Sequence, residues 1–342
     1  MTAPLGLPEL MAAIAVVALN AYVLLGGADF GGGVWDLLAS GPRRDAQRDL
    51  VSHAIGPIWE ANHVWLILVV VLLFTCFPSV FADLGITMHV PLSLMLIGIV
   101  LRGSAFTFRS YGGDASASQR RWGRVFAIAS VVTPALLGVI IGAIATGAVG
   151  RALEQVGAGA SFADIFVRPW LAPFPLAVGA LTLALFAFLA AVYLTVEARD
   201  AALREDFRRR ALASAAAVFV TAFGALLLSP HLAPLVRAGL VRSAWALPIH
   251  LATGVAALTA IGALWMRRFS VARVAAAAQV SLILWGWALA QRPWLVPPAL
   301  TITDAAAPRR TLLLVLWALA LGACVLLPSL AYLYRVFKRP AR

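Results

Sequence analysis

The chain has 342 residues, of which 62% are apolar and only 12% are charged, and its mean hydropathy is +0.91. This composition excludes a soluble globular domain and is typical of a polytopic membrane protein. The formal charge of +12 would favour nucleic acid as a partner of a soluble chain. Here the arginines lie between hydrophobic runs, so membrane topology explains them better than a polyanion does.

Nine apolar runs are long enough to cross a bilayer, because a hydrocarbon core of about 30 Å takes about 20 helical residues. They lie at 8–38, 53–79, 85–108, 122–148, 170–196, 210–230, 245–266, 270–291 and 311–336. The first run lacks a basic segment before it and a convincing cleavage site after it, so we expect it to be a retained span. It is also longer than a span requires, and we expect its glycine-rich end to break or to leave the hydrocarbon.

The predicted fold class is an all-α polytopic membrane protein with nine transmembrane helices in a single integral membrane domain, residues 1–342. We expect a first four-helix bundle over 1–148, a second over 170–291 and a peripheral terminal helix at 311–336. Of the 27 Lys and Arg residues, 20 fall in alternate connections on one side of these runs. The positive-inside rule then puts the C-terminus in the cytoplasm and the N-terminus outside, an arrangement that needs an odd number of spans.

Most ionisable groups inside the apolar runs belong to the first three. Asp29 stands in the stretch GGADFGGG that ends the first run, Glu60 and His63 lie in the second, and Arg102 ends the third. Because successive runs alternate in direction, these four groups are expected at similar depth, near the cytoplasmic surface. Ionised groups are costly in hydrocarbon, so they face a bundle interior, take partners or change protonation, and they mark functional candidates.

The spacing in the second run predicts a proton-transfer site. On a continuous helix His53, Glu60 and His63 share roughly one face, and Pro57 can kink that helix and free a backbone carbonyl beside them. A carboxylate and imidazoles at this spacing can pass protons through bound water. The predicted proton pathway comprises Glu60, Asp29 and His63, and the supporting charges and hydrogen bonds come from Arg102, His53 and Asn62.

Structural interpretations of the same residues stay open. Asp29 can bond backbone at a broken helix end, Glu60 can be the buried partner of Arg102, and His63 can be a hydrogen-bonded core residue. Gly27 and Gly31 can let another helix approach closely.

Metal and haem sites are less well supported by the sequence. The pair Glu60-x-x-His63 has the spacing used by carboxylate metal sites in helix bundles, but the second such pair that these sites need does not occur. Cys76 and Cys324 lie in apolar runs without a paired Cys or His ligand. Haem ligation by His63, His53 or Met88 is chemically possible. No well-separated pair on facing runs favours it.

Four stretches carry a family resemblance: GADFGGGVWDLL, IGPIWEANHVWLI, FP at 77–78 and LRGSAFTFRS. In this order they resemble subunit II of the bacterial cytochrome bd-type quinol oxidases. The motifs cover about the first 110 residues, and the second half of the chain is generic. The resemblance implies a multi-pass protein of the bacterial cytoplasmic membrane and a heterodimer with a haem-bearing subunit I.

The resemblance also implies how chemistry is divided in such a complex. Haem b, haem d and the quinol site are expected in subunit I, where quinol oxidation is coupled to reduction of dioxygen to water, and this chain is expected to hold no catalytic residue and no metal. Glu60 matches the family's membrane acid, whose proposed role is proton delivery, while Asp29 and Arg102 match the first-span acid and the third-span arginine. His63 stands where some members have Gln, so its role does not carry over.

Several partners and functions remain open at this point. They are a quinone or lipid bound in this chain, a small single-span accessory subunit, and two alternatives to the oxidase, namely a proton-coupled secondary transporter and a purely structural assembly subunit. No nucleic acid partner is expected.

Overall fold

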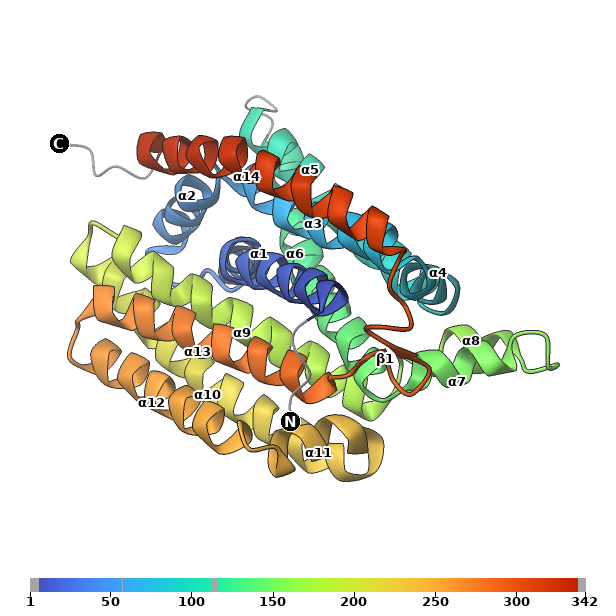
Figure 1. Ribbon diagram of the computed structural model, residues 1–342. Coiled ribbons are helices and arrows are strands. Elements are labelled where there is room, and N and C mark those ends of the chain that lie inside the picture. The colour runs from blue at the N-terminus through green and yellow to red at the C-terminus, as the bar shows by residue number, and fades with distance from the viewer. Residues whose placement is uncertain (1–5, 57, 112–115, 338–342) are drawn as a thin grey trace.

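The computed structural model describes residues 6–56, 58–111 and 116–337, without the side chains of 110, 111 and 116–120, and it is almost entirely helical (Figure 1). In chain order the elements are α1 (Leu7–Leu37), α2 (Arg44–Ile55), α3 (Trp59–Cys76), α4 (Pro78–Thr87), α5 (His89–Tyr111), α6 (Ser116–Ala145), α7 (Ala148–Gln155), α8 (Phe162–Phe166), α9 (Pro173–Glu197), α10 (Ala201–Leu232), α11 (Pro234–Arg242), α12 (Ala246–Trp265), α13 (Phe269–Gln291), β1 (Trp294–Val296), β2 (Leu300–Thr301) and α14 (Arg309–Phe337).

Nine helices in the described part of the chain are long and apolar enough to cross a membrane, which confirms the predicted fold class. They are α1, α3, α5, α6, α9, α10, α12, α13 and α14. The short helices α2, α4, α7, α8 and α11 and the antiparallel pair β1–β2 connect them. The side of the membrane that each end occupies stays a prediction.

The predicted second span, 53–79, is wrong at its start. Helix α2 ends at Ile55 and α3 begins at Trp59, and Ile58 between them has the non-helical angles φ −131° and ψ −8°. The predicted kink at Pro57 lies outside the described residues. A proline lacks the backbone N–H that continues the hydrogen bonds of a helix, so a helix boundary is expected near such a position. His53 therefore belongs to a different helix from Glu60 and His63.

The predicted break at the glycine-rich end of α1 is also wrong, because α1 is one helix from Leu7 to Leu37. The glycines provide space for neighbouring helices instead. A Cβ on Gly31 would lie 2.5 Å from the Phe186 carbonyl carbon of α9, and one on Gly33 would collide with the Ser130 side chain of α6. Trp35, one turn after Gly31, donates an indole N–H to the Ala187 carbonyl at 2.8 Å.

Helix α1 lies at the centre of the molecule, where it contacts α3, α6 and α9 (Figure 1). Helices α9, α10, α12 and α13 form one group beside it, and α6 packs against both α9 and α5. Residues of α3, α5 and α6 also pack against the hydrophobic core around α1 and α9. Helix α14 runs along the outside and touches α1 and α3. The division into bundles at 1–148 and 170–291 stays a prediction.

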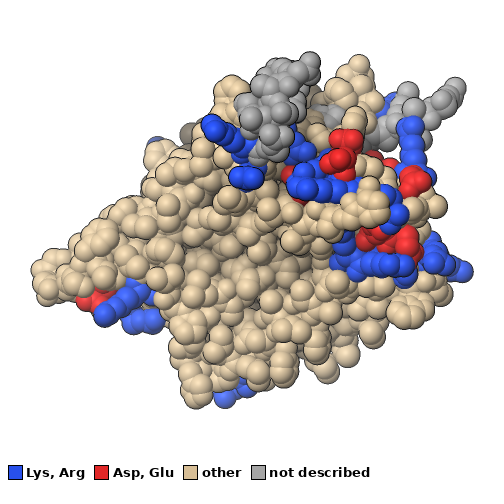
Figure 2. Space-filling view, turned by 180° about the vertical axis from the view of Figure 1, so that it is seen from behind, with Lys and Arg blue, Asp and Glu red and all other residues tan. Residues whose placement is uncertain are grey.

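Charged side chains gather toward one end of the molecule, and the broad face in Figure 2 is almost free of them. Among the charged side chains, Asp206 of α10 accepts hydrogen bonds from Arg43 at 2.6 and 2.8 Å and from Gln47 at 3.0 Å. Arg210 donates to Gln47 at 2.6 Å. The hydrogen bond and charge of Asp206 hold the pKa of Arg43 above its usual value. These contacts join the start of α2 to α10.

Candidate functional site

A chain of hydrogen-bonded side chains links three membrane helices near the glycine-rich part of α1. The Asn62 amide of α3 donates to the Asp29 carboxylate of α1 at 2.6 Å, and the Tyr334 hydroxyl of α14 donates to the Asn62 oxygen at 2.5 Å. Asp29 is 4% exposed and Asn62 is 1% exposed. This hydrogen bond favours one orientation of the buried carboxylate, because losing a donor to a buried charged group is costly.

Arg102 lies beside this hydrogen-bonded chain and is 1% exposed. Its guanidinium carbon lies 4.6 Å from the centroid of Phe30 and 5.3 Å from that of Phe126, and it interacts electrostatically with Asp29 and Tyr22. Its Nε and Nη2 have no hydrogen-bond partner among the described residues. Since arginine stays protonated in proteins, Asp29 supplies the opposite charge that a buried guanidinium needs.

His63 completes what we call the polar cluster, namely Asp29, Asn62, His63, Arg102 and Tyr334. Its ring centroid lies 5.8 to 5.9 Å from the rings of Tyr22, Phe30 and Trp59, and Phe30 also contacts Arg102. The buried Nδ1 has no hydrogen-bond partner in the described structure. The cluster therefore retains nitrogen atoms that can join a longer hydrogen-bonded route.

Glu60 and His53 are not brought into the polar cluster. Glu60 is exposed in the first turn of α3, and none of the described cations lies within 4.0 Å of it. The interpretation that Glu60 is the buried partner of Arg102 is therefore wrong. His53 is exposed on α2, with Nδ1 2.7 Å from the Asp49 carbonyl oxygen. The expected shared face of His53, Glu60 and His63 is wrong because the helix that would carry it ends at Ile55.

Sequence reasoning missed two polar contacts close to this region. Tyr334 lies 272 positions after Asn62, and no spacing signal in the sequence connects them. Asp36, at the end of α1, pairs with Arg109 of α5 at 2.9 Å, and the Asp36 side chain is 4% exposed. Asp36 belongs to the motif GADFGGGVWDLL and Arg109 to the motif LRGSAFTFRS, so the sequence contained a signal for that pair.

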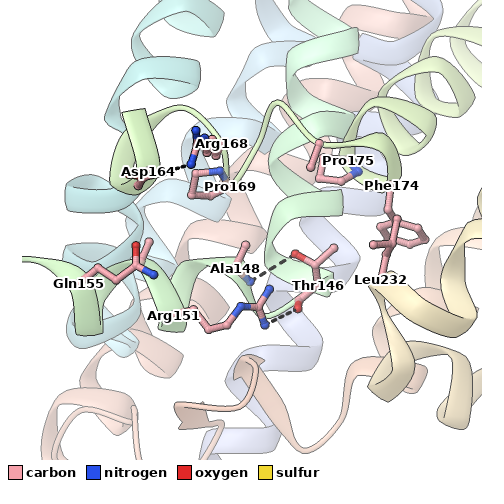
Figure 3. Close-up of a pocket in the computed structure, with 12 residues that line it drawn as sticks. Thr146, Ala148, Arg151, Gln155, Asp164, Arg168, Pro169, Phe174, Pro175 and Leu232 are labelled. Atoms are coloured by element: carbon pink, nitrogen blue, oxygen red, sulfur yellow. Dashed lines mark hydrogen bonds and ion pairs between the residues drawn. The ribbon is translucent and has the colours of Figure 1, made fainter. Parts of the chain in front are cut away.

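A separate cavity of about 240 Å³ lies at the other ends of the helices, between the end of α6, α7, α8 and the start of α9 (Figure 3). Arg151 donates to the Thr146 carbonyl at 3.1 Å, and Arg168 pairs with Asp164. The Ser161 hydroxyl and Arg168 hold the pKa of Asp164 below its usual value. Both arginines have partners within the cavity wall, and none of the predicted site residues lines it.

Comparisons with known proteins identify the family of the chain. Residues 7–337 match the family model of cytochrome bd terminal oxidase subunit II. The chain is 29% identical over 134 residues to cytochrome bd ubiquinol oxidase subunit 2 of Bacillus subtilis (strain 168), a match that covers 39% of each chain. It is 29% identical over 135 residues to cytochrome bd-I ubiquinol oxidase subunit 2 of Escherichia coli (strain K12), covering 38% of this chain and 34% of the relative.

These matches span between a third and two fifths of the curated relatives. The fold extends further, because a chain in the structure of bd oxidase from Geobacillus thermodenitrificans superposes with a TM-score of 0.75 at 21% identity, covering 97% of this chain and 98% of that one. The family model covers nearly the whole sequence. This chain therefore belongs to the cytochrome bd terminal oxidase subunit II family.

Proposed function

We propose that this chain is the second subunit of a bacterial quinol oxidase, in which a haem-bearing partner oxidises quinol and reduces dioxygen to water. Family membership and the relatives' names support this assignment. The nine membrane helices of a bd-oxidase subunit make the chain a multi-pass protein of the bacterial cytoplasmic membrane. The alternative of a proton-coupled secondary transporter loses support, because the family model that matches residues 7–337 is that of an oxidase subunit.

We also propose that the haems lie in the partner, and the positions of two candidate ligands in this chain support this. The ring of His63 is enclosed by aromatic rings of α1 and α3, whereas Met88 packs in a different core with Met11, Cys76 and Phe77. These two side chains cannot act as an axial pair. Electron transfer through haem is therefore proposed for the partner alone.

The contribution we propose for this chain is a cytoplasm-facing proton pathway through Glu60, with Asp29 and His63 as inner members. The observation that carries it is the position of Glu60, which is an exposed carboxylate only two residues before the buried Asn62. Glu60 lies in the first turn of α3, where its exposed carboxylate is accessible for proton exchange with its surroundings. Trp59 packs against Gly103 and Phe106, which fixes this turn level with Arg102 on α5.

Positioning is the role proposed for the rest of the polar cluster. Arg102 interacts electrostatically with the Asp29 carboxylate, and Asn62 and Tyr334 hold the orientation of that carboxylate. An amide cannot readily relay a proton, so Asn62 is a fixed link between α1, α3 and α14. A purely structural role for Asp29 predicts loss of assembly in an Asp29 variant, whereas a proton-carrying role predicts loss of turnover in an assembled complex.

The partner is proposed to cover the face of α3 and α5 that surrounds Glu60. Ile67 and Phe74 of α3 are each 60% exposed, and Leu96 and Val100 of α5 are 60% and 57% exposed. Apolar side chains of this kind can face lipid or another membrane helix with equal ease. Glu60 at the start of α3 favours a protein partner on this side, since a charged group in contact with lipid chains is costly.

Purification of the tagged chain from its native membrane tests the oxidase assignment. We expect a haem-bearing membrane polypeptide to co-purify, the preparation to show haem absorbance, and the complex to consume dioxygen when given a quinol. A colourless chain that purifies without such a polypeptide would contradict the assignment. Binding of a small solute by that colourless chain would instead support transport.

A further inference from the structure

A second concentration of arginines lies away from the polar cluster, where α12 turns into α13. Arg204 of α10 and Arg267 and Arg268 of the turn line a cavity of about 390 Å³. The end of α9 and residues 269–271 at the start of α13 complete its wall. No carboxylate is among the described residues that line it. The proposed oxidase function makes no use of this cavity.

Arg204 is held in place and keeps an uncompensated charge. Its Nε and Nη2 both donate to the Ala198 carbonyl, at 3.1 and 2.6 Å, and its guanidinium carbon lies 5.7 Å from the centroid of Phe269. A carbonyl accepts a hydrogen bond but carries no net charge. Arg204 therefore presents a fixed positive group to the cavity.

The two arginines of the turn add further positive charge. Arg267 has one carboxylate nearby, that of Glu205 at 3.6 Å, which Arg208 also binds at 2.7 and 2.8 Å. Arg268 has no carboxylate within 4.0 Å in the part of the chain that the structure describes. The wall of the cavity thus has three arginines and no carboxylate among its described lining residues, so it favours an anion.

Exposed apolar side chains flank the same cavity. Trp265 and Met266 at the end of α12 are 74% and 62% exposed, and Val271 and Val274 at the start of α13 are 47% and 68% exposed. Tryptophan is enriched where a membrane helix meets the headgroup region, and arginines there hold phosphate groups. An anion bound here would have its charge in the cavity and apolar surface directly beside it.

We propose that this cavity binds the phosphate of an anionic phospholipid, with Arg204, Arg267 and Arg268 as ligands and the acyl chains along α12 and α13. Guanidinium groups bind phosphate oxygens in pairs of charge-assisted hydrogen bonds. Phosphate is the shared chemistry, and a free phosphate ion is the other possible source of it. This inference needs the membrane location of the chain and is independent of the oxidase activity.

The test measures lipid binding by native mass spectrometry of the purified complex in detergent. Dioleoylphosphatidylglycerol and dioleoylphosphatidylcholine have the same chains and phosphodiester, but only the first has a net negative charge. We expect the first to bind more tightly. We also expect Arg267→Gln with Arg268→Gln to weaken its binding about 25-fold, since each arginine near a membrane surface contributes about fivefold.

Arg199→Gln is the matched control, because Arg199 is exposed in the connection between α9 and α10 and does not line the cavity. It should change binding by about twofold or less. If millimolar inorganic phosphate displaces the anionic lipid, the site accepts the free ion as well; if it does not, the site is specific for lipid.

Equal binding of the two lipids by the unaltered protein would overturn the proposal, and so would unchanged phosphatidylglycerol binding in the double variant. Arg268→Gln alone removes no ion pair to a described residue, so it provides the same comparison should the double variant fold poorly. It should weaken binding about fivefold.

Discussion

Replacing Gly31 by alanine should destabilise the protein, because α1 and α9 touch at this residue. The new Cβ would lie 2.5 Å from the Phe186 carbonyl carbon and 2.8 Å from the Ala190 methyl carbon, whereas ordinary contact begins at 3.4 Å. The two helices must therefore separate by at least about 0.9 Å. That movement strains the hydrogen bond from Trp35 to the Ala187 carbonyl, which is 2.8 Å long.

The magnitude follows from these two effects. Overpacking costs about 1–3 kcal/mol and a strained hydrogen bond about 1 kcal/mol, so the free energy of unfolding should fall by about 2–4 kcal/mol. Gly262→Ala is the matched control, since Gly262 is also helical and nothing lies within 4 Å of its added Cβ. It should stabilise α12 by up to about 1 kcal/mol in helix propensity.

Unfolding by dodecyl sulfate, followed through tryptophan fluorescence and helical circular dichroism, measures both variants in the same detergent. Equal stability of the Gly31→Ala and Gly262→Ala proteins would refute the conclusion that the glycines of α1 serve close helix contact.

Three further substitutions test other contacts. Asn62→Leu removes the donor to the buried Asp29 carboxylate and should cost about 1–3 kcal/mol in unfolding free energy, measured by the same titration; no loss would mean that the bond contributes nothing. Asp36→Asn should cost about 1–3 kcal/mol, because Arg109 loses its countercharge but keeps partial contact with solvent; an unchanged midpoint would contradict this. Burial raises the pKa of Asp83 above its ordinary 3.8, so the stability of the protein falls as the pH rises from 3.8 through the folded pKa. Asp83→Asn should therefore melt higher than the unaltered protein at pH 7 and not at pH 3, and an equal difference at both pH values would exclude this cause.

Composition and hydropathy predicted the nine spans because both are local properties of the sequence. A helix must satisfy its own backbone within the bilayer, so about 20 consecutive apolar residues are enough to identify one. The ends were less predictable. The boundary between α2, which ends at Ile55, and α3, which begins at Trp59, falls inside the predicted run 53–79.

The glycines of α1 show where local reasoning reaches its limit. Glycine can break a helix or allow a close approach, and the choice between them depends on what lies opposite. Opposite Gly31 is Phe186, which lies some 150 residues later in the chain. The sequence alone could not select the second role.

The site was partly predictable for the same reason. Alternating span directions placed Asp29, His63 and Arg102 at one depth, and the structure brings these three together around Phe30. The direction in which Glu60 points depends on the phase of α3, which starts anew after α2 ends. Its exposure therefore could not be derived from a spacing counted through Pro57.

The most direct test of the proposed proton pathway is the turnover of Glu60→Gln in a complex whose assembly and haem content are normal. Quinol-driven oxygen consumption should fall roughly a hundredfold, the lower end of what a positioned proton-transfer group contributes. Glu60→Asp should retain part of the rate, and Glu154→Gln, an exposed acid on α7, should retain all of it. Full turnover by the assembled Glu60→Gln complex would contradict a proton pathway through this chain.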